Sequence, residues 1–445
     1  MDNFLIEGSL FFLIGEKMKK ITLALMLLLT VAQVSACNKE EKKADDASAK
    51  APEAAAPKAA SSYDCSAVTV DSLKSKAKTT DKLFDKIDLK MVGIEIKMRD
   101  TTKNKKKVLE NDSYATILES LQCCTVDEKT FAIDKKSCVA HQTLDALKKD
   151  NILLPSLDTV AAQLAKHESP IVRGHAYASF SGLFGANAKD ISIAKTAIQT
   201  EKDPYALQQL VAGLSNEGGK DPEVGKFLLE MSKHENAFIR RKAAIALANT
   251  WSEKLEGAVD TVITLMNDAD PKTAKIACAG AGKLHNEKVI EPIVTILNDD
   301  TKVNLHDDCI RGLAALWIDY PTHKQHNEAA YQATMNYFKK TPRTNKIPAW
   351  SGIAAFNTVA NTRGELDAWK SEATWFKIDE FTQVMTDLIK DPNMNWLGKA
   401  PAMKAIKAYG GKAALESIAS TIEGVTGPQA DNIKKAYQTE LNSAK

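Results

Sequence analysis

"SPIVRGHAYASFSGL" (169–183), "DPYALQQLVAGLSNE" (203–217), "NAFIRRKAAIALANT" (236–250) and "DPKTAKIACAGAGKL" (270–284) are four versions of one pattern, and "KVNLHDDCIRGLAAL" (302–316) is a fifth. Their second residues stand at 170, 204, 237, 271 and 303, so the pattern recurs in steps of 34, 33, 34 and 32 residues. Each window follows an apolar-periodic stretch, such as "LDTVAAQL" from Leu157. Two helices per period form a hairpin that must stack on its neighbours to bury its apolar face. The sequence therefore predicts an all-α protein, an α-solenoid of stacked helical hairpins.

The windows share further residues at fixed places. A proline follows the first residue at Pro170, Pro204 and Pro271, and an arginine follows two apolar residues in "IVRGHAYASF" and "FIRRKAAIAL". Proline suits the first helical position because its missing N–H has no intrahelical partner there. On these residues the stretch from about 155 to 320 resembles the HEAT-repeat family, with a weaker continuation to 445. The resemblance implies a binding scaffold and leaves its partner open, because HEAT arrays have many unrelated ligands.

The resemblance also implies where a partner binds. In a HEAT stack the second helices line the inner wall, and equivalent window positions form columns. One column is Gly174, Gln208, Arg241, Lys275 and Asp307, and the next is His175, Gln209, Lys242, Ile276 and Asp308. We expect the partner-binding residues among the polar members, namely Gln208, Arg241, Lys242, Lys275, Asp307 and Asp308. Arg240 stands one position earlier, and we expect it to pair with Asp268 of the next repeat.

The N-terminal 36 residues have the pattern of a signal peptide. Its true start is predicted at Met18, because a basic pair and a 12-residue apolar core (21–32) follow that residue. The core ends in "VSAC" at Cys37, which resembles the lipobox of bacterial lipoproteins, whose cysteine carries the acyl chains. The prediction is an exported protein, lipid-anchored through Cys37 to a bacterial membrane. Asn38 favours the outer membrane, facing the periplasm. Ordinary secretion is the alternative, because Val34-Ser35-Ala36 also satisfies the small-residue cleavage rule.

Residues 37–62 are predicted to be a disordered tether. After Cys37 this segment has no Ile, Leu, Val, Phe or Trp, so it cannot bury enough apolar surface to offset its conformational entropy. A flexible chain of that length spans roughly 30 Å. The folded part would then be held away from the membrane.

Residues 63–150 are predicted to form a small helical module, with helices over 81–98 and 108–121. Four cysteines lie in it: Cys65, Cys123, Cys124 and Cys138. An oxidising compartment favours two disulfides. The vicinal Cys123 and Cys124 rarely bond each other, so each should take one of the other two. A metal site is the alternative, although neither a CxxC nor a paired Cys/His spacing is present.

The remaining part, 151–445, is predicted to be the solenoid, regular to about 320 and atypical beyond. Cys278 and Cys309 fall in consecutive second helices, one residue out of register, so we expect two buried free thiols, with a bridge as the alternative. Five of the six tryptophans are concentrated toward the C-terminus: Trp317, Trp350, Trp369, Trp375 and Trp396. They either fill the core of a capping region or form a recognition surface.

Catalytic motifs are lacking in the sequence. No GxSxG, HExxH or P-loop motif occurs, and "HKQH" (323–326) has no third ligand at zinc spacing. We interpret "HDD" (306–308), with Asp299 and Asp300, as an acidic turn in a solvated loop between repeats. We therefore expect no catalytic residue, no metal and no cofactor. The 59 basic and 57 acidic side chains give a net charge of +2, which argues against a nucleic-acid partner.

The leading hypothesis is thus a non-catalytic, membrane-anchored scaffold that binds another protein through its groove. One alternative is an enzyme of the HEAT-like lyase type, with a catalytic carboxylate or histidine in that groove. The other is a structural envelope protein that contacts peptidoglycan through the basic region 97–107.

Overall fold

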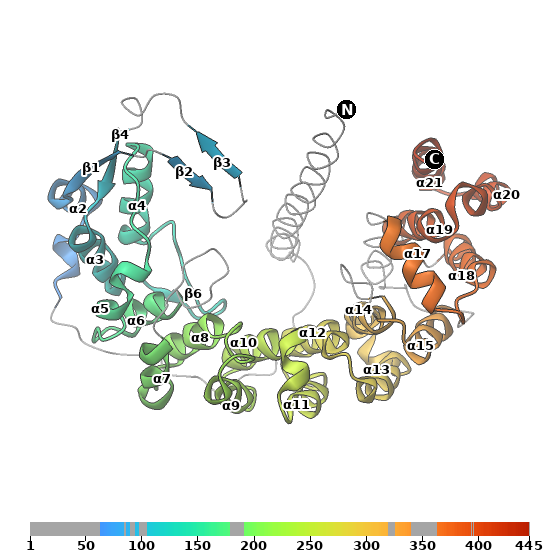
Figure 1. The fold of residues 1–445 in the computed structure, drawn as a ribbon, viewed down its shortest axis with the longest axis horizontal. Coiled ribbons are helices and arrows are strands. Elements are labelled where there is room, and N and C mark those ends of the chain that lie inside the picture. Colours follow the sequence, from blue (N-terminus) through green and yellow to red (C-terminus); the bar gives the residue numbers. More distant parts are fainter. Residues whose placement is uncertain are drawn as a thin grey trace, which may run out of the picture. The chain divides into compact units, whose positions relative to one another are not determined.

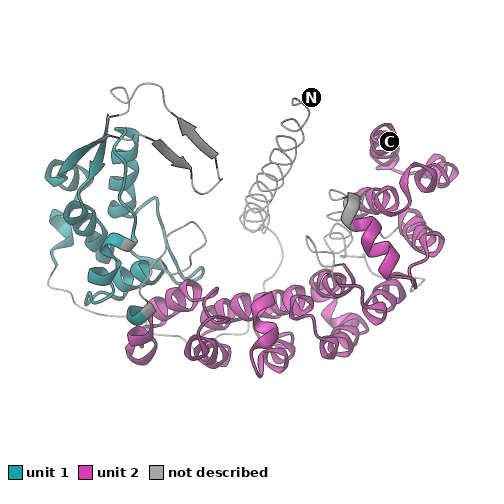
Figure 2. Ribbon diagram, in the orientation of Figure 1, with its two compact units in different colours: residues 1–193 teal, residues 194–445 magenta. Residues whose placement is uncertain are grey.

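The computed structural model describes residues 63–83, 86–89, 94–97, 105–178, 191–318, 325–339, 363–392, 394 and 396–444. The signal peptide, Cys37, the tether and Trp350 lie outside these residues. The described chain is mostly helical, which confirms the all-α class in its coarse form (Figure 1). None of the described helices has the length and apolar character needed to cross a membrane. Two compact units divide the chain, residues 1–193 and 194–445 (Figure 2).

The first unit mixes helices with short strands. Its elements are η1 (Cys65–Ala67), α2 (Val70–Lys76), β1 (Thr79–Leu83), β2 (Lys86–Leu89), β3 (Ile94–Lys97), β4 (Lys105–Leu109), α3 (Asn111–Glu119), η3 (Ser120–Cys123), β5 (Val126–Asp127), β6 (Ala132–Ile133), α4 (Val139–Lys149), α5 (Asp158–Leu164) and α6 (Pro170–Tyr177). Helix α7 (Ile191–Thr200) crosses the boundary between the units.

The second unit is helical throughout its described residues. Its α-helices are α8 (Pro204–Gly213), α9 (Pro222–Met231), α10 (Ala237–Leu247), α11 (Ala258–Leu265), α12 (Pro271–Gly280), α13 (Ile290–Leu297), α14 (His306–Trp317), α15 (Glu328–Lys339), α17 (Arg363–Glu372), α18 (Ile378–Lys390), α19 (Trp396–Glu416), α20 (Ala419–Glu423) and α21 (Ala430–Asn442). Short 3-10 turns join some of them: η5 (Thr250–Lys254), η6 (Ala281–Leu284), η7 (Glu287–Val289) and η8 (Asp300–Leu305).

The helix predicted over 81–98 is wrong, because this stretch contributes to three strands. Strand β1 pairs antiparallel with β4, and β2 pairs with β3. In the second pair Ile87 stands opposite Ile96, and Leu89 opposite Ile94. Apolar residues two apart on both strands are the period of a β-strand and not of a helix. The expected helix over 108–121 is present from Asn111 onward as α3.

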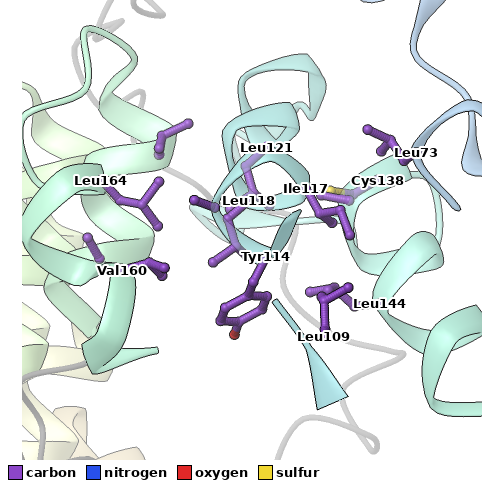
Figure 3. Packing of buried hydrophobic residues seen from close by; sticks show 14 of the residues in the cluster. Leu73, Leu109, Tyr114, Ile117, Leu118, Leu121, Cys138, Leu144, Val160 and Leu164 are labelled. Atoms are coloured by element: carbon purple, nitrogen blue, oxygen red, sulfur yellow. The ribbon is translucent and has the colours of Figure 1, made fainter. Parts of the chain in front are cut away.

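One apolar core holds the first unit together. Leu118 and Leu121 of α3 and η3 pack with Leu144 of α4 on one side and with Val160 and Leu164 of α5 on the other (Figure 3). Helices α5 and α6 therefore share the core of the cysteine-bearing module. The predicted domain boundary at residue 150 falls inside this unit.

Two disulfides close the first unit. Cys65 bonds Cys123 and Cys124 bonds Cys138, with Cα–Cα distances of 5.5 and 4.9 Å. Each vicinal cysteine thus takes a partner from elsewhere in the module, as the sequence predicts. The first bridge ties the N-terminal turn η1 to η3, and the second ties η3 to the start of α4.

In the second unit the second helices of the windows lie side by side in chain order. Helix α8 contacts α10, α10 contacts α12, α12 contacts α14, and α14 contacts α15 (Figure 1). The preceding helix of each window packs on its own partner, α9 on α10, α11 on α12 and α13 on α14. Toward the C-terminus the contacts continue through α18 and α19 to α21. The hairpins predicted from the repeat are therefore present.

The helices begin where the repeat predicts because proline, a capping side chain or both mark each start. The side chains of Asp203, Asn236 and Asp270 accept backbone N–H groups in the first turns of α8, α10 and α12. Proline occupies the first position of α6, α8 and α12. These local hydrogen bonds satisfy N–H groups that have no intrahelical acceptor. The fifth window differs, because α14 begins at His306 after the 3-10 turn η8.

A second side chain fixes each cap residue. Two positions before the cap, a side-chain acceptor takes the backbone N–H of the cap residue itself, at 2.7 to 3.0 Å. The acceptors, one period apart, are His167, Glu201, His234 and Asp268. Histidine therefore fills, through Nδ1, the place that aspartate fills at 268. The exchange of residue type conserves one hydrogen bond.

Helices α12 and α14 approach each other more closely than the sequence suggests. Cys278 and Cys309, both fully buried, form a disulfide with a Cα–Cα distance of 4.6 Å, so the expectation of free thiols is wrong. Two glycines explain the approach. A Cβ at Gly312 would lie 2.2 Å from the Cys278 carbonyl oxygen, and one at Gly282 would lie 1.9 Å from the Gly312 carbonyl oxygen. The backbones of the two helices are therefore in direct contact at this point. Helices that are separated by side chains usually lie 8–10 Å apart, axis to axis.

Replacing Gly312 by alanine should therefore lower the free energy of unfolding by about 2 to 3 kcal/mol, because the helices must separate to admit a methyl group. Gly424→Ala is the matched control, since its new Cβ would meet nothing nearer than 3.5 Å. Urea unfolding of both variants measures the difference. Equal midpoints for the two variants would contradict the close approach.

The C-terminal aromatic residues form core. Trp317 and Trp369 are 0% and 1% exposed, and the Trp369 indole N–H donates to the Trp317 carbonyl oxygen at 2.8 Å. Tyr331 and Tyr409 pack against Trp317 with ring centroids 5.3 and 6.4 Å away. These contacts favour the core-filling interpretation over a recognition surface for Trp317 and Trp369, whereas Trp375 is half-buried. The side chain of Trp396 lies outside the described residues.

Candidate partner-binding face

The six predicted partner-binding residues do not share one environment. Gln208 is 5% exposed, because α8 is buried around most of its circumference. Its amide oxygen accepts from the neighbouring Gln209 side chain at 3.5 Å. Gln208 therefore lies in the interior. The next residue of α8, Gln209, is half-buried.

Arg241 is also committed to the protein itself. Its guanidinium donates two hydrogen bonds to Asp270, each of 2.7 Å, and lies 4.7 Å from the centroid of the Phe238 ring. Asp270 in turn accepts from the Thr273 backbone N–H at the start of α12. Burial alone would raise the pKa of Asp270, but hydrogen bonds from Arg241 and Thr273 lower it to about 2. Arg241 thus clamps α10 to the start of α12, and the proposal of a groove-facing cation at 241 is corrected.

Arg240 does what the sequence predicts. It donates to both carboxylate oxygens of Asp268, at 2.7 and 2.8 Å, and to the carbonyl oxygens of His234 and Glu235. Arg240 and Asp268 are largely buried, with side chains 17% and 7% exposed. The adjacent Arg240 and Arg241 therefore each form a bidentate ion pair, with Asp268 and Asp270 respectively, at the start of the following window.

The other four candidates remain half-buried on the surface of their helices. Burial, followed by the neighbouring charge of Arg241, lowers the pKa of Lys242. Lys242 has no ion-pair or hydrogen-bond partner within the described residues. Burial raises the pKa of Asp308 to about 6 in spite of the charges of Arg311 and Lys275. Lys275 and Asp307 are half-buried as well.

Equivalent positions of the packed windows extend this set into one face. Three residues after Lys242, Ile245 is 48% exposed on α10. The equivalent pairs are Ile276 and Ala279 on α12 and Asp308 and Arg311 on α14, all of them exposed or half-buried. We call these six residues the second-helix face: Lys242, Ile245, Ile276, Ala279, Asp308 and Arg311.

Sequence reasoning missed Ile245 and Arg311, although a signal was present. Residues three apart on a helix share a side, so Ile245 belongs with Lys242, and Arg311 with Asp308. The column of small and apolar residues at 212, 245 and 279 repeats at the period of the windows. A search restricted to polar positions passes over it.

Asp308 makes the stability of the second unit depend on pH. Its folded pKa of about 6 exceeds the usual value of about 4. The folded protein therefore binds this proton more tightly, and stability falls as the pH rises from about 4 to about 6. Asp308→Asn should raise the unfolding free energy at pH 7.5 by roughly 1 to 2 kcal/mol, after discounting for partial exposure, and change it little at pH 4.5.

Urea unfolding at the two pH values tests this expectation. The control is Asp260→Asn, which removes an exposed acid from the first turn of another helix, α11. A gain at neutral pH that the control shares would assign the effect to net charge and contradict the role of burial.

Metal ligands do not gather in the described part of the chain. No group of three or more His, Cys, Asp or Glu side chains there can hold a metal ion. Of the "HKQH" pair, His323 lies outside the described residues, and His326 stands 3.6 Å from Glu372. The "HDD" histidine, His306, is buried and lies 3.1 Å from the Tyr337 hydroxyl through Nδ1.

Comparisons with known proteins give little guidance. No protein-family model matches this chain. No curated protein matches it either. Among solved structures, it is similar to an engineered protein determined by the Northeast Structural Genomics Consortium, with 12% identity and a TM-score of 0.37. That match covers 75% of this chain and 84% of the engineered one. A likeness at this level supports no inference about function.

Proposed function

We propose that this protein is a cell-envelope lipoprotein, anchored to a bacterial membrane through Cys37, which binds another protein along the second-helix face. Its hairpins would stack as an α-solenoid of the HEAT type. The observation that carries the binding proposal is the exposed Ile245 beside Lys242, a half-buried cation with no partner in the described residues. Both stand on a helix that neighbouring windows hold in place.

The stacking part of the proposal is supported by the links between successive windows. Helices α8, α10, α12 and α14 contact one another in chain order. The forks from Arg240 and Arg241 join α10 to the turn before α12, and the Cys278–Cys309 disulfide joins α12 to α14. Each link connects consecutive windows, as a repeat array requires. A surface built on such helices is rigid, which reduces the ordering cost of binding.

The chemistry of the face suggests the kind of partner. Ile245, Ile276 and Ala279 provide apolar surface on α10 and α12, with Lys242 at one end and Asp308 with its ion-pair partner Arg311 at the other. A partner segment with an acidic residue that reaches Lys242, next to an apolar side chain, matches this order. The charges would fix orientation and association rate more than affinity, and the apolar surface would supply the affinity.

Export is supported by the disulfides. All six cysteines of the described residues are paired. Disulfides form and persist in oxidising compartments outside the cytosol. This observation is independent of the signal pattern at 18–37 and agrees with it.

A photo-crosslinking residue at position 245 tests the binding proposal in intact cells. We expect a specific crosslinked product there and none with the same residue at Lys226, an exposed position on α9. The product should disappear when Lys242→Glu is added. Crosslinks of equal yield at 226 and 245, or a yield that Lys242→Glu leaves unchanged, would contradict the assignment of the face.

Fractionation tests the anchor separately. Cys37→Ala should move the protein from the membrane to the soluble fraction, because the acyl chains attach at that sulfur. A wild-type protein that is already soluble after lysis, with an unmodified Cys37, would exclude lipid anchoring.

A further inference from the structure

A cavity of about 350 Å³ opens on the first unit beside the ribbon of β1 and β4. Its wall combines the ribbon, the start of α3 and the segment before α5. The lining carries hydroxyl groups from Thr80, Ser156 and Thr159, the amide of Asn111, the carboxylate of Glu110 and the ammonium group of Lys82. Val108 and Leu109 supply apolar surface. Polar groups around a small apolar floor are typical of small-molecule sites.

Backbone hydrogen bonds make this wall rigid. Strand β4 pairs with β1 on one edge, and on the other it bonds to Leu153, whose N–H donates to Lys107 and whose carbonyl accepts from Leu109, each at 2.9 Å. The Glu110 N–H donates to the Lys78 carbonyl at 3.0 Å, which ties the start of α3 to the ribbon. The cavity is therefore preformed by secondary structure and not by loops alone.

The register of the ribbon places Lys106, which does not itself line the cavity, directly opposite the lining residue Lys82. Thr80, Lys82 and Val108 share one face of the ribbon and line the cavity, together with Leu109 at the end of β4. Lys82 stands opposite Lys106 on the same face. Like charges directly opposite each other destabilise a strand pair. Within the described residues neither lysine has an acidic partner.

The other face of the same ribbon shows the contrast. There Asp81 stands opposite Lys107, a pair of unlike charges. Lys82 and Lys106 thus face each other as two positive charges, whereas on the opposite face the charge of Lys107 is balanced by that of Asp81. An anionic group bound between Lys82 and Lys106 would remove the repulsion and gain two charge-assisted hydrogen bonds.

We propose that this cavity binds an acidic sugar, through an anionic group held by Lys82 and Lys106. Glu110 argues against a bare anion, because a carboxylate in the lining repels it. The same carboxylate and the Asn111 amide hydrogen-bond sugar hydroxyl groups well. The Thr159 hydroxyl, which donates to the Ser156 carbonyl oxygen at 2.7 Å, can accept from a further sugar hydroxyl. The apolar floor at Val108 suits the C–H face of a pyranose ring. The anionic group is a carboxylate or a phosphate, from a free sugar or from an envelope glycan.

Titration calorimetry with three probes tests the proposal on the full exported chain. Glucuronate should bind, while glucose, which lacks the carboxylate, and inorganic phosphate, which lacks the ring, should bind at least tenfold more weakly. Glucose 6-phosphate distinguishes phosphate from carboxylate as the preferred anion. Insoluble envelope glycan in a co-sedimentation assay separates a polymer from a free sugar, since only the polymer carries the protein into the pellet.

Adjacent lysines supply the matched variants. Lys106→Gln should weaken glucuronate binding at least tenfold, whereas Lys107→Gln, on the opposite face, should leave it unchanged. Without ligand, Lys106→Gln should melt at the same temperature as the wild type or higher, because it relieves the repulsion with Lys82. Equal losses in the two variants, or phosphate binding as tightly as glucuronate, would overturn the acidic-sugar site.

Discussion

Loss of the Cys278–Cys309 disulfide is expected to lower the unfolding free energy of the second unit by about 3 to 4 kcal/mol. The bridge closes a loop across a sequence separation of 31 residues, and both sulfurs lie in the interior between α12 and α14. Closing such a loop restricts the unfolded chain, and its loss restores that entropy. Urea unfolding of the Cys278→Ala, Cys309→Ala double variant, compared with the oxidised wild type, measures the effect.

The location of the loss distinguishes this bridge from the other two. Amide hydrogen exchange should quicken in α12 and α14, while the first unit keeps its protection, since its disulfides Cys65–Cys123 and Cys124–Cys138 are intact. Peptide mass spectrometry under non-reducing conditions checks the pairing directly. Free thiols at 278 and 309 in the purified protein would contradict the structure at this point.

Arg240→Ala should have the second largest effect, a loss of about 3 kcal/mol. The change leaves Asp268, 7% exposed, as an uncompensated buried carboxylate, and it removes two further hydrogen bonds to the turn before α10. Lysine at 240 should recover only part of the loss, because an ammonium group cannot form the planar fork that both carboxylate oxygens accept.

Arg311→Ala is the matched control for that measurement. Arg311 is 49% exposed and stands 3.6 Å from Asp308, so its removal should cost less than about 1 kcal/mol. Similar losses for the two arginines, measured as urea midpoints, would show that the Arg240–Asp268 fork contributes no more than a surface pair.

Much of the helical register could be predicted from the sequence because its causes are local. The window anchors at 170, 204, 237 and 271 are the first residues of α6, α8, α10 and α12. Proline and a capping side chain act within one turn, and each start has one or both of them, so four residues suffice to fix it. The anchor at 303 failed, because that window has neither a proline nor a capping side chain at 302, and it begins with the 3-10 turn η8.

The candidate site was harder to predict because its residues are decided by contacts between windows. Aligning equivalent positions of the windows predicts which side of its helix a residue faces, and this placed Lys242 and Asp308 on the surface. It does not show that Asp270 lies within reach of Arg241, or that α8 is buried deeply enough to enclose Gln208. The close approach of α12 and α14 was missed for the same reason. Gly282 and Gly312 permit it only because they lie against each other between the two helices, and this contact is not visible in the sequence.

The row of neighbour-to-neighbour contacts has a mechanical consequence. When the ends of the second unit are pulled apart, hairpins with few links to their neighbours should detach one at a time, as successive steps in a force–extension trace. The segment between Cys278 and Cys309 cannot lengthen while its disulfide is intact. At about 3.5 Å per residue, this withholds roughly 100 Å of contour length from the extended chain. Added reductant should release that length as one further step.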